Sequence, residues 1–241
     1  MNILGIPPQE ILPVSHTLPS AIARQNRRPV TLCGQDVPAS SHICAFFDSR
    51  KEQDQVLLPF FREGVENREQ VVSVFDAQAN PHHLQHLAHG GLAHDDSGLA
   101  RQLRVMNAEE SFLAAGRFDA DRMFGTINLI LEAAAHTEFP HVRTCCEMTW
   151  ALHHLEAMDP LIEYESRLNT LTGHHDCTLM CVYDVNLFSG PVLMDVLATH
   201  PYVLMGQTLT ENPYYVPPRE YLERVLRRRA APVARKAALP A

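Results

Sequence analysis

The feature that most constrains the fold is an apolar stretch that runs directly into a helix start. Residues 42–47 (His-Ile-Cys-Ala-Phe-Phe) predict a buried strand, and Ser49 and Glu52 follow with capping-box spacing. In α/β proteins such a junction binds ligands, because free helix N–H groups lie beside the strand ends. A nucleotide-binding protein would place a glycine-rich loop ending in Lys-Ser or Lys-Thr here. The only lysines, Lys51 and Lys236, follow no such loop, so we expect a pocket without a phosphate cradle.

The rest of the chain repeats this order of strand and helix. Strands are expected at 71–75, 103–106, 142–145, 178–183 and 202–205, and helices at 50–67, 81–93, 108–115, 120–135, 148–155, 161–171, 192–198 and 219–229. Apolar strands that alternate with helices are typical of a parallel sheet covered on both sides. The sequence therefore predicts an α/β fold, with a mostly parallel sheet and helices on both faces.

Composition divides the chain into three parts. Residues 1–40 contain six prolines and little periodicity, which predicts an irregular N-terminal arm. Residues 41–230 predict one domain, because 241 residues that are 46% hydrophobic provide one good core. Residues 231–241 are expected to form a flexible tail.

Location and partners are constrained by what the sequence lacks. No stretch approaches the ~20 apolar residues of a membrane-spanning helix, and the N-terminus does not read as a secretory signal. We therefore expect a cytoplasmic protein without membrane contact, whose six cysteines are thiols. A net charge of -8 disfavours direct nucleic-acid binding, because phosphates dominate that affinity.

Polar side chains lie in or beside four of the predicted strands. His42 and Cys44 share a strand face because they are two residues apart. Glu147 follows the strand at 142–145, the segment 181–184 (Cys-Val-Tyr-Asp) ends another, and His200 precedes the last. Parallel strands end at one crevice, so Glu147 and the segment 181–184 are expected to converge there. His42 and Cys44 lie nearer their strand's start, so the sequence leaves open whether they reach it.

These residues also have structural and metal-binding explanations. Cys44 and Cys181 fit an apolar core as small hydrophobic side chains, and a buried Glu147 needs a partner in any case. His42 and the two cysteines are suitable metal ligands, although no Cys-x-x-Cys spacing supports them. The pair at 82–86 has the spacing of two helical ligands but no nearby acid. No complete nucleophile–base set is present, so we do not expect an enzyme.

A series of ordered motifs spans residues 41–225. It consists of 42–47, Leu58-Pro59-Phe60, Glu63-Gly64, Val142-Arg143, 147–152 (Glu-Met-Thr-Trp-Ala-Leu), 161–165 with Arg167 and Asn169, 181–184, Phe188, His200-Pro201, Asn212-Pro213 and Pro217-Pro218. This series resembles the MEDS domain, the methanogen/methylotroph sensory domain. The resemblance implies a fold similar to RecA/KaiC-type ATPases without a working phosphate loop. It also implies a sensory role in signal transduction and transcription regulation, directed at small hydrocarbon derivatives. The family typically has Gly where Cys146 stands, a change that narrows the pocket or adds a thiol.

We therefore expect a sensory domain that binds a small ligand in a degenerate nucleotide-type pocket and acts on a regulatory protein partner. The expected lining consists of His42, Cys44, Phe46, Glu147, Trp150, Cys181, Tyr183 and Asp184. The segment 77–99 is the expected mobile element, since a ligand signals only by shifting a conformational equilibrium. The alternative is a metal- or haem-dependent sensor that uses His42 and a cysteine thiolate, with Cys44 the first candidate. The ligand's identity, the output and the formation of a homodimer stay open.

Overall fold

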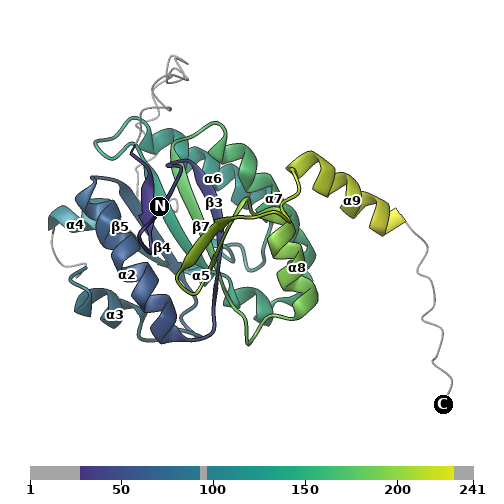
Figure 1. Cartoon of the computed structure of the whole chain (residues 1–241), viewed down its shortest axis with the longest axis horizontal. Coiled ribbons are helices and arrows are strands. Elements are labelled where there is room, and N and C mark those ends of the chain that lie inside the picture. The colour runs from purple at the N-terminus through teal and green to yellow at the C-terminus, as the bar shows by residue number, and fades with distance from the viewer. Residues whose placement is uncertain (1–27, 93–96, 231–241) are drawn as a thin grey trace.

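A seven-stranded sheet forms the centre of the computed structural model, which describes residues 28–92 and 97–230 (Figure 1). The strand order is β5–β4–β6–β7–β3–β8–β9, and only β9 runs antiparallel, to β8. The strands are β3 (Ser41–Phe47), β4 (Gln70–Phe75), β5 (Leu103–Asn107), β6 (Val142–Glu147), β7 (Cys177–Asp184), β8 (Tyr202–Met205) and β9 (Thr208–Glu211). The predicted mostly parallel α/β sheet is confirmed.

Helices cover both faces of the sheet and bury a separate apolar cluster on each. One face carries α2 (Arg50–Glu66), α3 (His83–His89) and α4 (Ser97–Gln102). The other carries α5 (Ala108–Ser111), α6 (Ala120–Ala134), α7 (Met158–Thr172) and α8 (Gly190–Thr199). Helix α9 (Pro218–Ala230) packs on α7 and α8 and extends away from the sheet (Figure 1). Among the described residues, no helix is both long and apolar enough to cross a membrane.

Strand β3 lies between β7 and β8 and alternates its side chains between the two clusters. Ile43, Ala45 and Phe47 join the cluster under α2, whereas Cys44 and Phe46 join the one under α7. All seven residues of β3 are buried, as expected for an inner strand covered on both faces. The alternation decides which polar side chains of the strands can meet.

Helix α2 begins where the capping-box spacing predicts. Ser49 is the N-cap, and its Oγ accepts a hydrogen bond from the backbone N–H of Glu52 at 3.4 Å. The Glu52 carboxylate accepts in turn from the N–H of Asp48 at 3.0 Å. Two residues therefore connect β3 to α2, and their capping contacts occupy N–H groups that a phosphate would need. Pro59 lies inside the helix without ending it.

The N-terminal arm is not wholly irregular, which corrects the prediction for residues 1–40. Strands β1 (Val30–Leu32) and β2 (Gln35–Val37) form an antiparallel hairpin. Its turn places Cys33 and Gly34 at φ angles of 52° and 74°, the left-handed conformation that tight hairpin turns require. Three-residue strands next to prolines leave too short a pattern to detect. Residues 1–27 and the tail at 231–241 lie outside the described residues.

Two further segments differ from the sequence prediction, and a third is described only in part. The helix expected at 148–155 is a pair of 3-10 turns, η1 (Thr149–His153) and η2 (Leu155–Ala157). Strand β9 was not predicted. The expected mobile segment 77–99 contains α3 and the start of α4, and residues 93–96 lie outside the described part. None of these changes the sheet order around β3.

Candidate functional site

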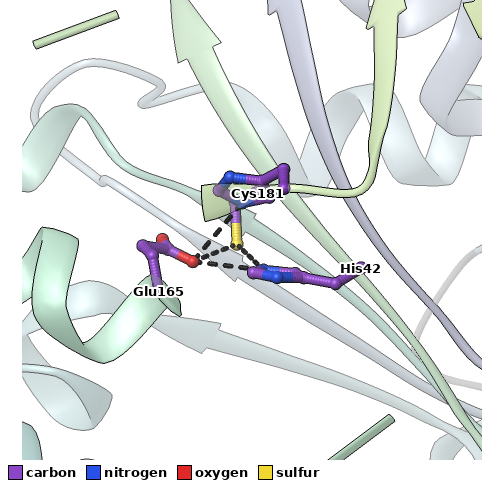
Figure 2. Close-up of side chains that lie close together, drawn as sticks. His42, Glu165 and Cys181 are labelled. Carbon is purple, nitrogen blue, oxygen red and sulfur yellow. Dashed lines mark hydrogen bonds and ion pairs between the residues drawn. The ribbon is translucent and has the colours of Figure 1, made fainter. Parts of the chain in front are cut away.

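Four buried side chains with metal-binding atoms converge under α7. His42 comes from β3, Cys181 from β7, Glu165 from α7, and His200 from the residue that ends α8. One donor atom of each lies within 4.8 Å of the other three, and no member is more than 4% exposed. Figure 2 shows three of them pointing toward one another. We call these four residues the Glu165 cluster.

The Oε2 atom of Glu165 lies at the centre of the cluster. It is 3.2 Å from His42 Nε2, 3.5 Å from His200 Nε2 and 3.3 Å from Cys181 Sγ. The same thiol lies 3.6 Å from His42 Nε2. The other carboxylate oxygen, Oε1, accepts a hydrogen bond from the Tyr183 hydroxyl at 3.0 Å. One carboxylate oxygen is therefore fixed by a phenol, and the other faces two imidazoles and a thiol.

Asn169 determines where His42 carries its proton. The Asn169 amide nitrogen donates to the carbonyl oxygens of Thr199 and Ser166, at 2.8 and 2.9 Å. Its Oδ1 therefore faces His42 Nδ1, at 3.2 Å, and an oxygen there can only accept. His42 must be protonated on Nδ1, and its Nε2 faces Glu165.

His200 is arranged in the same way. Its Nδ1 lies 2.8 Å from the carbonyl oxygen of Val196, one turn back in α8, and donates to it. Its Nε2 is buried and faces Glu165 Oε2 at 3.5 Å.

Burial controls the ionisation of this cluster. It lowers the pKa of His42 to about 4, helped by the neighbouring His200, so the ring is neutral at physiological pH. Burial alone would raise the pKa of Glu165, but the contacts with His200 and His42 outweigh it and hold that pKa well below its ordinary value. Burial and the Glu165 charge raise the pKa of Cys181. Burial therefore disfavours a charge on His42 and on Cys181, while the contacts with the two imidazoles favour the charged form of Glu165.

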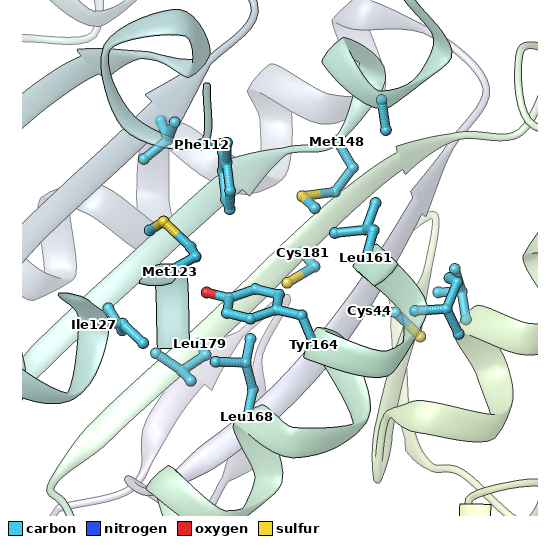
Figure 3. Close-up of a cluster of buried hydrophobic side chains, with 14 of the residues drawn as sticks. Cys44, Phe112, Met123, Ile127, Met148, Leu161, Tyr164, Leu168, Leu179 and Cys181 are labelled. Atoms are coloured by element: carbon cyan, nitrogen blue, oxygen red, sulfur yellow. The ribbon is translucent and has the colours of Figure 1, made fainter. Parts of the chain in front are cut away.

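An apolar cavity of about 50 Å³ adjoins the cluster, between the sheet, α6 and α7. Its wall includes Phe112, Met123, Ile127, Tyr164, Leu168 and Leu179, which Figure 3 shows around the Cys181 thiol. Glu165 and Cys181 belong to the cavity wall as well as to the cluster. Cys146, where the MEDS family typically has Gly, also lines it. The cavity thus has mainly apolar walls, with the Glu165 carboxylate on the side of the cluster.

The pocket is not where the sequence placed it. The sequence pointed to the junction of β3 and α2, whereas the cavity lies on the opposite face, under α6 and α7. Of the residues expected to line it, Cys181 does so, and His42 and Tyr183 contact Glu165 beside it. The pocket residues divide in this way because successive side chains of a strand point to opposite faces of the sheet.

Glu147 lies on the other face and does not converge with Cys181, contrary to expectation. Its carboxylate accepts hydrogen bonds from Arg50 at 2.7 Å, Gln53 at 2.7 Å and Asn80 at 2.8 Å. These partners tie the start of α2 to the segment after β4. A buried carboxylate with this many donors is a structural anchor.

Cys44 and Phe46 are core residues on the cluster's side of the sheet. The Cys44 thiol points to the carbonyl oxygen of Tyr202 in β8, at 3.6 Å, and is not a member of the Glu165 cluster. Phe46 packs against the Tyr183 ring, with centroids 6.1 Å apart. Neither lines the cavity. The first candidate thiol for a metal is therefore replaced by Cys181.

Trp150 and Asp184 have supporting roles. Trp150 is buried and stacks on Phe112, a residue of the cavity wall, with ring centroids 5.0 Å apart. Asp184 ends β7, where its carboxylate accepts from the N–H of Asn186 and forms a turn. Trp150 therefore lies one ring away from the cavity, and Asp184 lies outside it.

The sequence prediction missed Glu165 and did not select His200. Glu165 follows Leu161 and Ile162 and precedes Leu168 on the buried side of α7, so it is a carboxylate on an apolar helix face. A charged residue at such a position needs a buried partner. That signal was present in the sequence, but the identity of the partners depends on the fold.

The comparisons with known proteins bear on the family and the fold. Residues 41–201, which include the whole Glu165 cluster, match the MEDS family, described as the "MEthanogen/methylotroph, DcmR Sensory domain". The transcriptional repressor DcmR of Methylorubrum extorquens is 24% identical over 177 residues, which are 73% of this chain and 64% of the repressor. The match thus spans less than two thirds of that relative's length.

A solved structure supports the fold alone. The KaiC-like protein PH0186 from Pyrococcus horikoshii superposes with a TM-score of 0.51 at 14% identity, over 80% of this chain and 79% of that one. The expected KaiC-like architecture is thereby confirmed. Because the family match covers well over half of the sequence, the chain belongs to the MEDS family of sensory domains.

Proposed function

We propose that this chain senses a small, mainly apolar molecule that binds in the cavity between α6, α7 and the sheet. The observation that carries the proposal is an apolar cavity whose lining includes a single carboxylate, Glu165. A volume of about 50 Å³ accommodates a molecule of a few non-hydrogen atoms, since one water needs roughly 10–15 Å³ by the same measure. A short hydrocarbon derivative with one polar group fits this description.

Helix α7 connects the cavity to the outer helices of the domain. Helix α7 contributes Tyr164, Glu165 and Leu168 to the cavity wall, and it packs against α8 and α9. A ligand that prefers one position of α7 would shift the equilibrium of the helices packed on it. We propose that α9, which extends from the domain and exposes Leu226, transmits this shift to a regulatory protein partner. Transcription regulation is the proposed context, by analogy with the DcmR repressor.

We infer binding rather than nucleotide chemistry. The two-residue connection between β3 and α2 is closed by its own capping contacts through Ser49 and Glu52. The Glu147 carboxylate near the start of α2 is fully engaged by donors from its own chain. These contacts support a sensor that neither binds nor hydrolyses ATP.

Metal-dependent sensing is the second candidate, and the convergence of the Glu165 cluster favours it. The thiol in that cluster belongs to Cys181 instead of Cys44. The haem version is not supported, because the adjoining cavity of about 50 Å³ is far below the ~300–1,000 Å³ of pockets for larger ligands.

A cavity-filling substitution tests the small-molecule proposal. Ile127 lines the cavity and Leu129, two residues further along α6, is 61% exposed. Ile127→Phe should fill the cavity, while Leu129→Phe adds a similar group to the surface. Thermal unfolding would be measured with a panel of one- to four-carbon halides, alcohols and ketones. A ligand at 100 times its Kd stabilises a protein by about 2.7 kcal/mol.

The expected result is that at least one compound raises the Tm of the wild type and of Leu129→Phe, but not of Ile127→Phe. Stabilisation that persists in Ile127→Phe would place the ligand elsewhere. A panel that stabilises none of the three proteins would contradict the proposed ligand class.

A further inference from the structure

We infer that the Glu165 cluster binds one divalent transition-metal ion with the ligand preferences of Zn²⁺. The ligands would be His42 Nε2, His200 Nε2, Glu165 Oε2 and Cys181 Sγ. This deepens the metal-dependent candidate function, and it stands apart from the cavity ligand because metal content is measured without one.

The first argument is the orientation of the two imidazoles. Asn169 and the Val196 carbonyl accept the Nδ1 protons of His42 and His200, so each ring turns its Nε2 atom inward. Both Nε2 atoms face the carboxylate oxygen of Glu165, at 3.2 and 3.5 Å. A nitrogen lone pair and a buried carboxylate oxygen at such distances need a proton or another cation between them. A metal ion among the three atoms can take the place of that proton.

The second argument is the spacing of the donor atoms. Tetrahedral zinc has bonds of about 2.0–2.1 Å to nitrogen and oxygen and about 2.3 Å to sulfur, which separates neighbouring ligand atoms by roughly 3.3–3.7 Å. Four of the six distances between the donor atoms of the cluster are 3.2, 3.3, 3.5 and 3.6 Å. The remaining two are no more than 4.8 Å. The side chains therefore already have spacings close to those of a tetrahedral site.

The third argument is charge. With Glu165 ionised and the Cys181 thiol deprotonated, two negative charges would be buried together, and a divalent ion balances them. An uncompensated buried charge is strongly destabilising, whereas a neutral metal site is not. Binding would release the thiol proton, as metal binding to cysteine does generally. Mixed nitrogen, sulfur and oxygen ligands suit Zn²⁺ rather than Mg²⁺ or Ca²⁺.

The groups around the cluster orient its ligands as they do in metalloproteins. Metal-binding histidines usually donate their second N–H to a carbonyl or carboxylate oxygen, which fixes the ring and its tautomer. His42 does so to Asn169, and His200 to Val196. The free oxygen of the ligating carboxylate is held by Tyr183. Three of the four ligands thus have an outer partner that leaves the metal-facing atom free.

Cobalt substitution tests the site directly. The full chain would be purified, stripped with a chelator, checked by elemental analysis and titrated with Co²⁺. We expect one Co²⁺ per chain, with the visible bands of tetrahedral cobalt and a near-ultraviolet band from thiolate-to-cobalt charge transfer. One equivalent of Zn²⁺ should remove both. A wild-type protein that binds no stoichiometric Co²⁺ or Zn²⁺, or shows no thiolate band, would overturn the inference.

Cys44 supplies a matched control for the ligating thiol. Cys44 and Cys181 are paired across β3 and β7, and both are buried under α7. Cys181→Ser should abolish the charge-transfer band and weaken metal binding by more than about 100-fold, because changes in outer partners alone cost 10–100-fold. Cys44→Ser should keep the band and the affinity. A band that survives Cys181→Ser, or disappears equally in folded Cys44→Ser, would show that Cys181 is not the ligand.

If both serine variants fail to fold, the Co²⁺ spectrum of the wild type still tests whether the cluster binds a metal through a thiolate. The Ile127→Phe variant, in which the cavity is filled, should still bind one Co²⁺. Small-molecule binding that persists in Ile127→Phe, with cobalt binding intact, would contradict the cavity proposal and leave the metal site standing.

Discussion

Cys44 and Cys181 are paired on adjacent strands, yet only Cys181 contacts Glu165. Both thiols are buried on the same side of the sheet. The two thiols point in different directions along the sheet. The Cys44 thiol points to the Tyr202 carbonyl in β8, whereas the Cys181 thiol points to Glu165 of α7. Two residues with the same local sequence pattern thus have different chemistry, and the predictions below depend on that difference.

Replacing Asn169 should weaken metal binding through His42. Asn169→Ala removes the oxygen that holds the Nδ1 proton of His42, so its Nε2 lone pair is no longer fixed toward Glu165. We expect a 10–100-fold loss of Co²⁺ affinity with one equivalent still bound at saturation. Asn128→Ala is the control, since that amide contacts Glu132 on α6. Equal affinities in the two variants would exclude the proposed role of Asn169.

Glu147 should matter for stability and not for binding. Glu147→Gln turns an acceptor of hydrogen bonds from Arg50, Gln53 and Asn80 into a neutral amide, which should cost roughly 1–3 kcal/mol of unfolding free energy. Its Co²⁺ affinity should stay within about twofold of the wild type. Urea melts and cobalt titrations on the same preparation would measure both. A large loss of metal affinity in a stable Glu147→Gln variant would show that Glu147 takes part in metal binding.

The metal-free protein should lose stability as the pH falls below 6.5. Burial lowers the folded-state pKa of both His42 and His83 to about 4, so the unfolded chain takes up protons first. The stability is lost progressively as the pH falls from 6.5, the unfolded value, to about 4, the folded value, by roughly 2 kcal/mol for each ring at pH 5. Urea melts between pH 7.5 and 5 measure the loss. In His83→Gln, part of the pH dependence should disappear, and a flat wild-type profile would refute both assignments.

The protein should not bind ATP. The backbone N–H of Asp48 and that of Glu52 are both occupied by capping contacts, and no glycine-rich loop precedes α2. Calorimetry with ATP and Mg²⁺ should therefore give no heat beyond dilution. A micromolar Kd would show that the phosphate site is still functional.

Trp150 should report occupancy of the cavity. It is the only tryptophan, it is 2% exposed, and it stacks on Phe112 in the cavity wall. A compound that raises the Tm should also change the intensity or wavelength of its emission, because the ring's partner moves or gains a neighbour. Emission that stays constant at saturation would place the ligand away from Phe112.

The fold was predictable from the sequence, and the site only in part. Continuous apolar strands such as 42–47, together with the capping pattern at Ser49, depend on local residue order, which a sequence displays. The partners of Glu165 come from strands and a helix end far apart in the chain, and strand order decides which of them meet. Glu147 was assigned to the wrong side because its strand continues through it, which places it on the α2 face. The strand extends two residues beyond the predicted end at 145, and that extension decided the error.

Glu165 and Cys181 belong to both the cavity wall and the Glu165 cluster, so the proposed small-molecule site and the proposed metal site would be energetically coupled. By thermodynamic reciprocity, a molecule in the cavity that changes the affinity for the metal by some factor has its own affinity changed by the same factor. The free metal concentration in the cell would then set the level of the small molecule at which the domain responds.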